Sequence, residues 1–296
     1  MKRLALVALV AVACGAAPAH AQTLAIAYKS GETYKYMLHS TVNQSMNTGM
    51  MTVPIKIDVT AGETVTVNSV DSSGTADVSI ALSNVVIKST TGQVNSTTSG
   101  MQMPVINMKV ASDGRVLSAA GNGLGGDPMG MFSGGGGFIS AVLPDTAVKP
   151  GDTWSKDFDQ ANRLGTGTIH VLAKSTYLRD EALKGITAAV VETKSTSTID
   201  ITIDMSKAIP KGVTDASGAP PPTLPPGMFQ SLSMKGTITS DTTTWFDTAR
   251  LRVLKTHKTG TTSATMSYTG STGPTMPGLT GPMMIKGDET TDQNPD

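Results

Sequence analysis

Methionine is the residue type that this sequence supplies in unusual number, with 17 among 296 residues. Several of them lie close together in the chain: Met46, Met50, Met51, Met101 and Met103. Thioether sulfur is a soft ligand that suits Cu(I), so this set is a candidate metal site of an exported metal-handling protein. Methionine is also an adaptable apolar surface for ligands or partners. A third interpretation is that it simply replaces leucine in loops and core.

A second candidate group combines methionine with other apolar side chains in the segment "DPMGMFSGGGGFISAVLP". A short helix over 137–143, stopped by Pro144, is too brief to be stable alone and must pack on something. It is either a permanent plug of the sheet or a lid over an apolar cleft, with the glycines as its hinge. Water disfavours exposed apolar surface, so these side chains must pack on the sheet if the segment is a plug, or cover a ligand if it is a lid. They are Met129, Met131, Phe132, Phe138, Ile139, Val142 and Leu143.

Side chains for catalysis are few. His39, His170 and His257 all lie in strand patterns, and neither an HExxH nor a GxSxG motif accompanies them. Asp157 and Asp159 share one face of a strand, which suggests calcium, but the further oxygen ligands of a calcium loop are missing. The pattern favours solvated charges. We therefore expect a non-enzymatic protein without a cofactor, and an unrecognised hydrolase is the alternative.

The first residues have the pattern of a signal peptide. Lys2 and Arg3 precede a short apolar stretch, and "AHA" at 19–21 provides the small residues of a cleavage site. We expect removal of residues 1–21 and a periplasmic or secreted protein without an integral membrane span. The alternative is lipid attachment through Cys14.

The charge balance excludes one class of partner. Removing Lys2 and Arg3 leaves 23 − 2 = 21 basic against 23 acidic side chains, spread without runs. A nucleic-acid partner would need a basic stripe, so none is expected. The partner is otherwise unknown, and an apolar small molecule or an envelope component fits best.

The elements that must position these residues are β-strands. Tyr34, Tyr36 and Leu38 alternate with polar residues, as do the apolar residues of 53–59 and 76–82. Such period-two patterns predict half-buried strands. Only 137–143 and 228–233 resemble short helices.

A repeated phrase predicts the domain organisation. "KSGETY" at 29–34 and "KPGDTW" at 149–154 each precede a long strand, and a hairpin around Asp and Arg ends each half. We expect two similar antiparallel β units forming a curved sheet, open barrel or sandwich, with one or two short helices. The expected parts are a first β unit (22–120), a Gly/Met-rich linker with a short helix (121–146), a second β unit (147–269) with a Pro-rich insertion (206–227), and a Gly/Pro/Thr-rich tail (270–296).

"LPDTAVKPGDTW" and "TTTWFDTARLRVL", together with the signal peptide, resemble families of uncharacterised secreted bacterial proteins with two similar β-rich halves. The resemblance covers about 140 to 255, and Ala249 and Arg250 stand where those families usually have a glycine. It implies an exported β protein. The function expected is binding, of an apolar ligand or lipid, or scaffolding.

Overall fold

The period-two segments form antiparallel β-strands in the computed structural model. The structure describes residues 21–100, 103, 105–120, 142–161, 165–204, 231–269 and 282–296. Within these ranges the regular elements are all strands, so the predicted mainly-β class is confirmed. No helix in this part of the chain has the length and apolarity needed to cross a lipid bilayer.

Each half of the chain contributes six strands. Those of the first half are β1 (Thr33–Asn47), β2 (Thr52–Val70), β3 (Ala76–Thr91), β4 (Val94–Ser99), β5 (Ile106–Val110) and β6 (Val116–Ala120). Those of the second half are β7 (Thr153–Ala161), β8 (Gly165–Leu183), β9 (Ile186–Asp204), β10 (Ser231–Asp247), β11 (Arg252–Thr269) and β12 (Met283–Pro295).

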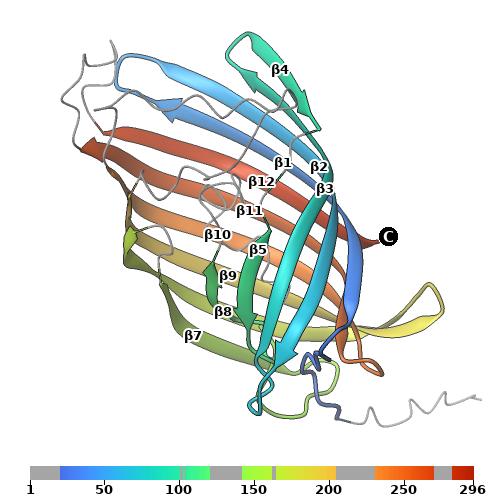
Figure 1. Cartoon of the computed structure of the whole chain (residues 1–296). Helices are drawn as coiled ribbons and strands as arrows, with labels where there is room; N and C mark the ends of the chain where they lie inside the picture. The colour runs from blue at the N-terminus through green and yellow to red at the C-terminus, as the bar shows by residue number, and fades with distance from the viewer. Residues whose placement is uncertain are drawn as a thin grey trace, which may run out of the picture.

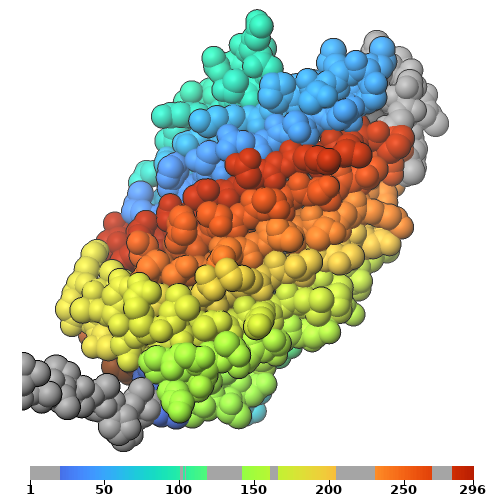
Figure 2. All heavy atoms as spheres, turned by 180° about the vertical axis from the view of Figure 1, so that it is seen from behind, coloured from blue at the N-terminus to red at the C-terminus, as the bar shows by residue number. Residues whose placement is uncertain are grey.

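All twelve strands belong to one sheet in the order β6-β5-β3-β2-β1-β12-β11-β10-β9-β8-β7, and β4 pairs with the other end of β3. The first strand, β1, pairs with the last, β12, in antiparallel fashion. The paired residues run from Tyr36 opposite Pro295 to Asn47 opposite Met284. Figure 2 shows β12 lying between β1 and β11 on the outer surface. The sheet curls into a barrel (Figure 1). The barrel has one seam, because the described residues of β6 and β7, the two ends of the strand order, form no ladder with each other.

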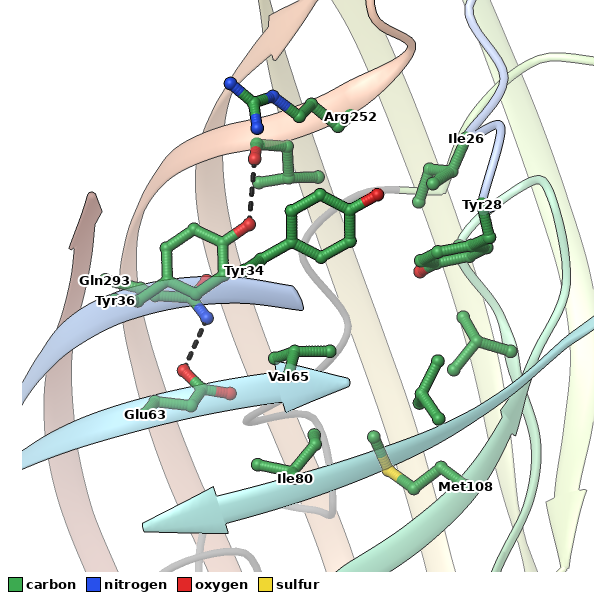
Figure 3. Close-up of a pocket in the computed structure, with 14 residues that line it drawn as sticks. Ile26, Tyr28, Tyr34, Tyr36, Glu63, Val65, Ile80, Met108, Arg252 and Gln293 are labelled. Carbon is green, nitrogen blue, oxygen red and sulfur yellow. Dashed lines mark hydrogen bonds between the residues drawn. The ribbon is translucent and has the colours of Figure 1, made fainter. Parts of the chain in front are cut away.

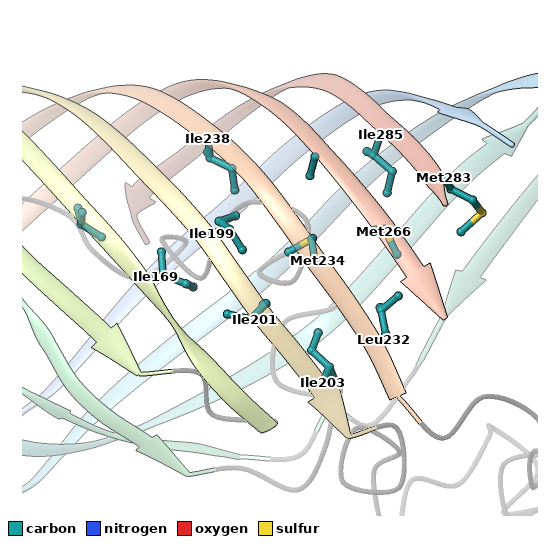
Figure 4. Close-up of a cluster of buried hydrophobic side chains, with 12 residues drawn as sticks. Ile169, Ile199, Ile201, Ile203, Leu232, Met234, Ile238, Met266, Met283 and Ile285 are labelled. Carbon is teal, nitrogen blue, oxygen red and sulfur yellow. The ribbon is translucent and has the colours of Figure 1, made fainter. Parts of the chain in front are cut away.

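The interior of the barrel is zoned along its length. At one end, Ile199, Ile201 and Ile203 alternate along β9 and join the apolar cluster of Figure 4. Each such side chain contributes about 1.5–3 kcal/mol when fully buried. The middle is polar, because one row of paired residues crosses five strands: Ser175, Thr193, Thr242, Lys258 and Thr291. The interior is apolar again at the end where β1 begins, in two further clusters.

The two repeated phrases form turns with the same backbone hydrogen bonds. In the first, Gly31 N donates to Val67 O and Val67 N donates to Glu32 O. In the second, Gly151 N donates to Tyr177 O and Tyr177 N donates to Asp152 O. Both glycines have positive φ, 85° and 96°, which explains the residue type. The domain boundaries and the duplication of the two units stay predictions.

Two expectations need correction. The helix expected over 228–233 is wrong where the structure describes it, because Ser231–Ser233 begin β10 and pair with Asp204–Thr202 of β9. In the helix expected over 137–143, Val142 and Leu143 have no helical hydrogen bonds, and residues 137–141 lie outside the described ranges.

Candidate functional site

A pocket opens at the end of the barrel where β1 begins, between the two apolar clusters of that end. It encloses about 630 Å³ of space, which includes its solvent-open mouth. Residues from six strands, from the N-terminal segment and from one turn line it (Figure 3): Ile26, Tyr28, Tyr34, Tyr36, Glu63, Val65, Val78, Ile80, Met108, Val110, Gly114, Arg252, Val253 and Gln293.

One wall of the pocket is apolar because three neighbouring strands turn the same face inward. Val65 of β2 lies opposite Ile80 of β3, and Val78 of β3 lies opposite Met108 of β5. Val78, Ile80 and Met108 are at most 3% exposed. The predicted alternation of 76–82 and of β2 is therefore confirmed, and it produces a continuous hydrocarbon surface.

Three tyrosines stand between the apolar wall and the polar one. Tyr36 donates a 2.9 Å hydrogen bond to Val253 O, and the Tyr34 hydroxyl donates to Glu32. Burial raises the pKa of Tyr34 and Tyr36, and the nearby carboxylates Glu32 and Glu63 add to the effect. Burial alone raises the pKa of Tyr28 to about 12. All three phenols are therefore neutral at ordinary pH.

The polar wall carries one carboxylate and one guanidinium. Glu63 is 3% exposed and accepts a 2.6 Å hydrogen bond from Gln293 Nε2. The Arg252 guanidinium lies 5.9 Å from the centre of the Tyr34 ring, within the range of cation–π attraction. Its Nε is buried without a hydrogen-bond partner, and the nearest carboxylate oxygen, Asp247 Oδ2, is 3.7 Å away.

A buried ion pair occupies the polar middle of the barrel beyond the pocket. Lys258 Nζ lies 2.5 Å from Glu289 Oε1, and the two side chains are 9% and 6% exposed. The Glu289 side chain lies over Gly260 of the neighbouring strand, where a Cβ would come within 3.1 Å of its Cγ. Glycine at this position thus provides room for the carboxylate.

The residues expected to form a lid fall into two groups. Val142 and Leu143 are buried, at 2% and 0% exposure, and neither lines the pocket. Leu143 N donates to Asp113 O, and Val142 O accepts from Trp154 Nε1. Leu143 belongs to the apolar cluster that also contains Tyr177 of β8. The other expected lid residues, Met129, Met131, Phe132, Phe138 and Ile139, lie outside the described residues.

The methionines considered for Cu(I) have different environments. Met46 packs against the apolar cluster of Figure 4, whereas Met50 and Met51 are 78% and 63% exposed in the turn after β1. Met103 is half-buried and Met101 lies outside the described residues. Among the described members of this set, only the sequence neighbours Met50 and Met51 share one environment.

The histidines lie on the outer face of the sheet, as expected for His39, and each pairs with an aspartate. His39 Nε2 lies 3.2 Å from Asp58, and this hydrogen bond lowers the pKa of the Asp58 carboxyl. His170 Nδ1 lies 2.8 Å from Asp159, and that bond raises the pKa of His170. In the described ranges, no three His, Cys, Asp or Glu side chains gather as metal ligands. These pairs join neighbouring strands.

Sequence reasoning missed most of the pocket. The alternation of Tyr34 and Tyr36 placed two tyrosines on the inner face, but nothing in the pattern linked them to Arg252 or Gln293. The pairing of β1 with β12 and of β12 with β11 brings those residues to the pocket, although they follow β1 by more than 200 residues. Glu63 had one local signal, since it is an acid at an inward position of an apolar strand.

Comparisons with known proteins showed a distant structural likeness. No family model and no curated sequence matches this chain. Among solved structures it is similar to one described as "lipid-protein interactions in lipovitellin", at 8% sequence identity and a TM-score of 0.44. The likeness covers 89% of this chain and 25% of that chain. At that distance it carries no argument about function.

Proposed function

We propose that this chain is an exported, non-enzymatic binding protein that holds a small, mainly apolar ligand inside the open end of its barrel. The pocket is the observation that carries the proposal. Apolar side chains from β2, β3 and β5 form one wall, and a few polar groups stand opposite. Ligand sites commonly have this composition, with apolar lining and a few polar groups that orient the ligand.

The rigidity of the surroundings also supports binding. The pocket walls are central strands of a continuous sheet, so the lining side chains start from a fixed backbone. A preformed site loses less conformational entropy when a ligand enters. An apolar small molecule or a lipid of the cell envelope is the partner that this composition favours.

Export is the second part of the proposal. It rests on Lys2, Arg3, the apolar stretch and the small residues at 19–21, which together have the pattern of a signal peptide. A periplasmic or secreted carrier would meet apolar molecules that water alone dissolves poorly.

The test is the binding of an uncharged fluorescent probe, N-phenyl-1-naphthylamine, to the purified protein. Val65→Phe places a ring in the pocket, and we expect it to weaken binding at least about tenfold, because the space for the probe is lost. Thr66→Phe is the matched control, since Thr66 is the next residue of β2 and faces outward. It should bind as wild type does.

Far-ultraviolet circular dichroism of both variants would verify that the sheet is intact. Two results would overturn the proposal: a wild-type protein that leaves the probe fluorescence unchanged, or a folded Val65→Phe protein that binds the probe as tightly as wild type.

A further inference from the structure

The polar wall of the pocket contains donors that lack partners, and these define the ligand more closely. Tyr28 lines the pocket, and its hydroxyl makes no hydrogen bond within the described residues. Arg252 likewise donates no hydrogen bond there, and its Nε is buried without a partner. An unsatisfied buried donor such as Arg252 Nε is costly, so an acceptor that reaches Arg252 would be stabilised, and the half-buried Tyr28 offers it a second donor.

The neighbouring acids make no hydrogen bond to these donors, although Asp247 forms an ion pair with Arg252. Asp247 is fixed to its own turn, where Oδ1 accepts from Ala249 N at 3.0 Å and from Arg250 N at 2.9 Å. Its other oxygen remains 3.7 Å from Arg252 Nε, too far for a hydrogen bond. The Tyr34 hydroxyl donates to Glu32, and Tyr36 donates to Val253 O. Arg252 and Tyr28 thus remain the donors open to a ligand.

The Arg252 charge is already shared with the buried Asp247, whose Oδ2 is 3.7 Å from Nε, so the pocket favours a ligand with at most one negative charge. Arg252 is the cation that lines the pocket, and Glu63 stands in the same lining with Gln293 donating to its carboxylate. A dianionic phosphate would meet the Glu63 charge with only one guanidinium to balance it. A monocarboxylate can pair with Arg252, because the forked N–H donors of the guanidinium fit the planar carboxylate group.

We propose that the ligand is a monocarboxylate amphiphile, such as a fatty acid. Its carboxylate pairs with Arg252, its hydrocarbon chain lies along Val65, Ile80 and Met108, and Tyr28 donates to one of its oxygens. This inference rests on the proposed function, because it specifies the ligand of the same pocket. Arg252 is about one third exposed, so the carboxylate lies toward the mouth and the chain extends inward.

The experiment is displacement of N-phenyl-1-naphthylamine by three ligands of equal chain length: dodecanoate, dodecanol and dodecylamine. With wild type, we expect dodecanoate to displace the probe at a concentration about tenfold lower than dodecanol does, the effect of a hydrogen bond to a charged group. Arg252→Gln should remove this preference while the uncharged probe still binds. Arg250→Gln is the matched control, because Arg250 lies two residues earlier, in the turn before β11, and does not line the pocket.

Tyr28→Phe provides a second variant in case Arg252→Gln unfolds, and it should reduce the preference for dodecanoate several-fold. Equal displacement by dodecanoate and dodecanol, or a preference for dodecylamine, would overturn this inference while the proposed function stands. An unchanged preference in both folded variants would overturn it as well. Absence of probe binding to wild type would overturn the proposed function, and the carboxylate inference with it.

Discussion

The turns at Lys29–Tyr34 and Lys149–Trp154 have the same backbone and different surroundings. Each joins its following strand to the next one through the same pair of hydrogen bonds, and a β-bulge follows in each case, after Val67 and after Tyr177. Beside the first turn lies the pocket. Beside the second lies an apolar cluster in which Tyr177 and Phe246 are fully buried.

The difference between the two regions is one of side-chain volume. The position that Tyr177 occupies at the second turn is occupied by Val67 at the first. Phe246 belongs to the same cluster as Tyr177. Two large aromatic side chains thus fill the interior beside the second turn. The backbone motif determines how a strand begins, and the volume of the neighbouring side chains determines whether space remains inside.

The largest expected effect tests whether the second region is as tightly filled as its burial indicates. Phe246→Ala should lower the free energy of unfolding by about 3–5 kcal/mol, because it leaves a cavity among fully buried neighbours. Val65→Ala in the pocket should cost only about 1–2 kcal/mol, since its side chain already borders open space. Urea unfolding followed by circular dichroism measures both. Equal losses would mean that the two regions are packed alike.

The sequence predicted the strands well, because their cause is local. Alternation placed Tyr34, Tyr36 and Leu38 on one face of the strand, and in the structure that face points into the barrel. The position of the last strand in the sheet could not be predicted from local sequence. Residues 270–296 were expected as a tail after the second unit, yet β12 within them is central, between β1 and β11. Its place depends on pairing between the two ends of the chain, which no period-two pattern specifies.

The candidate site was harder to predict for the same reason. Arg252 and Gln293 come from strands that follow β1 by more than 200 residues, and their roles depend on register. Lys258 and Glu289 illustrate the limit further. A sequence pattern places charged residues outside, but here they compensate each other within the barrel. Only the fold brings such partners together.

A second effect concerns the tyrosines at the first turn and depends on pH. The pKa of Tyr28 is raised from 10.0 to about 12 in the folded protein. Folding therefore favours the protonated phenol, and this contribution is complete below pH 10 and is lost as the pH rises through about 12. The loss is about 2–3 kcal/mol for such a shift.

Urea unfolding of wild type and Tyr28→Phe between pH 8 and pH 12 measures this contribution, with ultraviolet absorbance reporting phenolate formation. Phenylalanine does not ionise, so the variant should lose less stability at high pH. The same alkaline loss in both proteins would show that Tyr28 ionises as freely as an exposed phenol, and that the pocket is more open than the structure shows.

The smallest effect should be equal in the two regions, and it tests the shared backbone. Gly31 and Gly151 have φ of 85° and 96°, and a Cβ at either position would meet no atom within 4 Å. Gly31→Ala and Gly151→Ala should therefore each cost about 1–2 kcal/mol from the left-handed backbone alone. Asparagine tolerates this conformation better, so Gly31→Asn and Gly151→Asn should recover part of the loss. Thermal unfolding of the four variants would measure it. A much larger loss of stability at Gly151 than at Gly31 would mean that the filled core also constrains the turn, so that backbone and side-chain volume are not independent. Equal losses of stability would leave side-chain volume as the cause of the pocket.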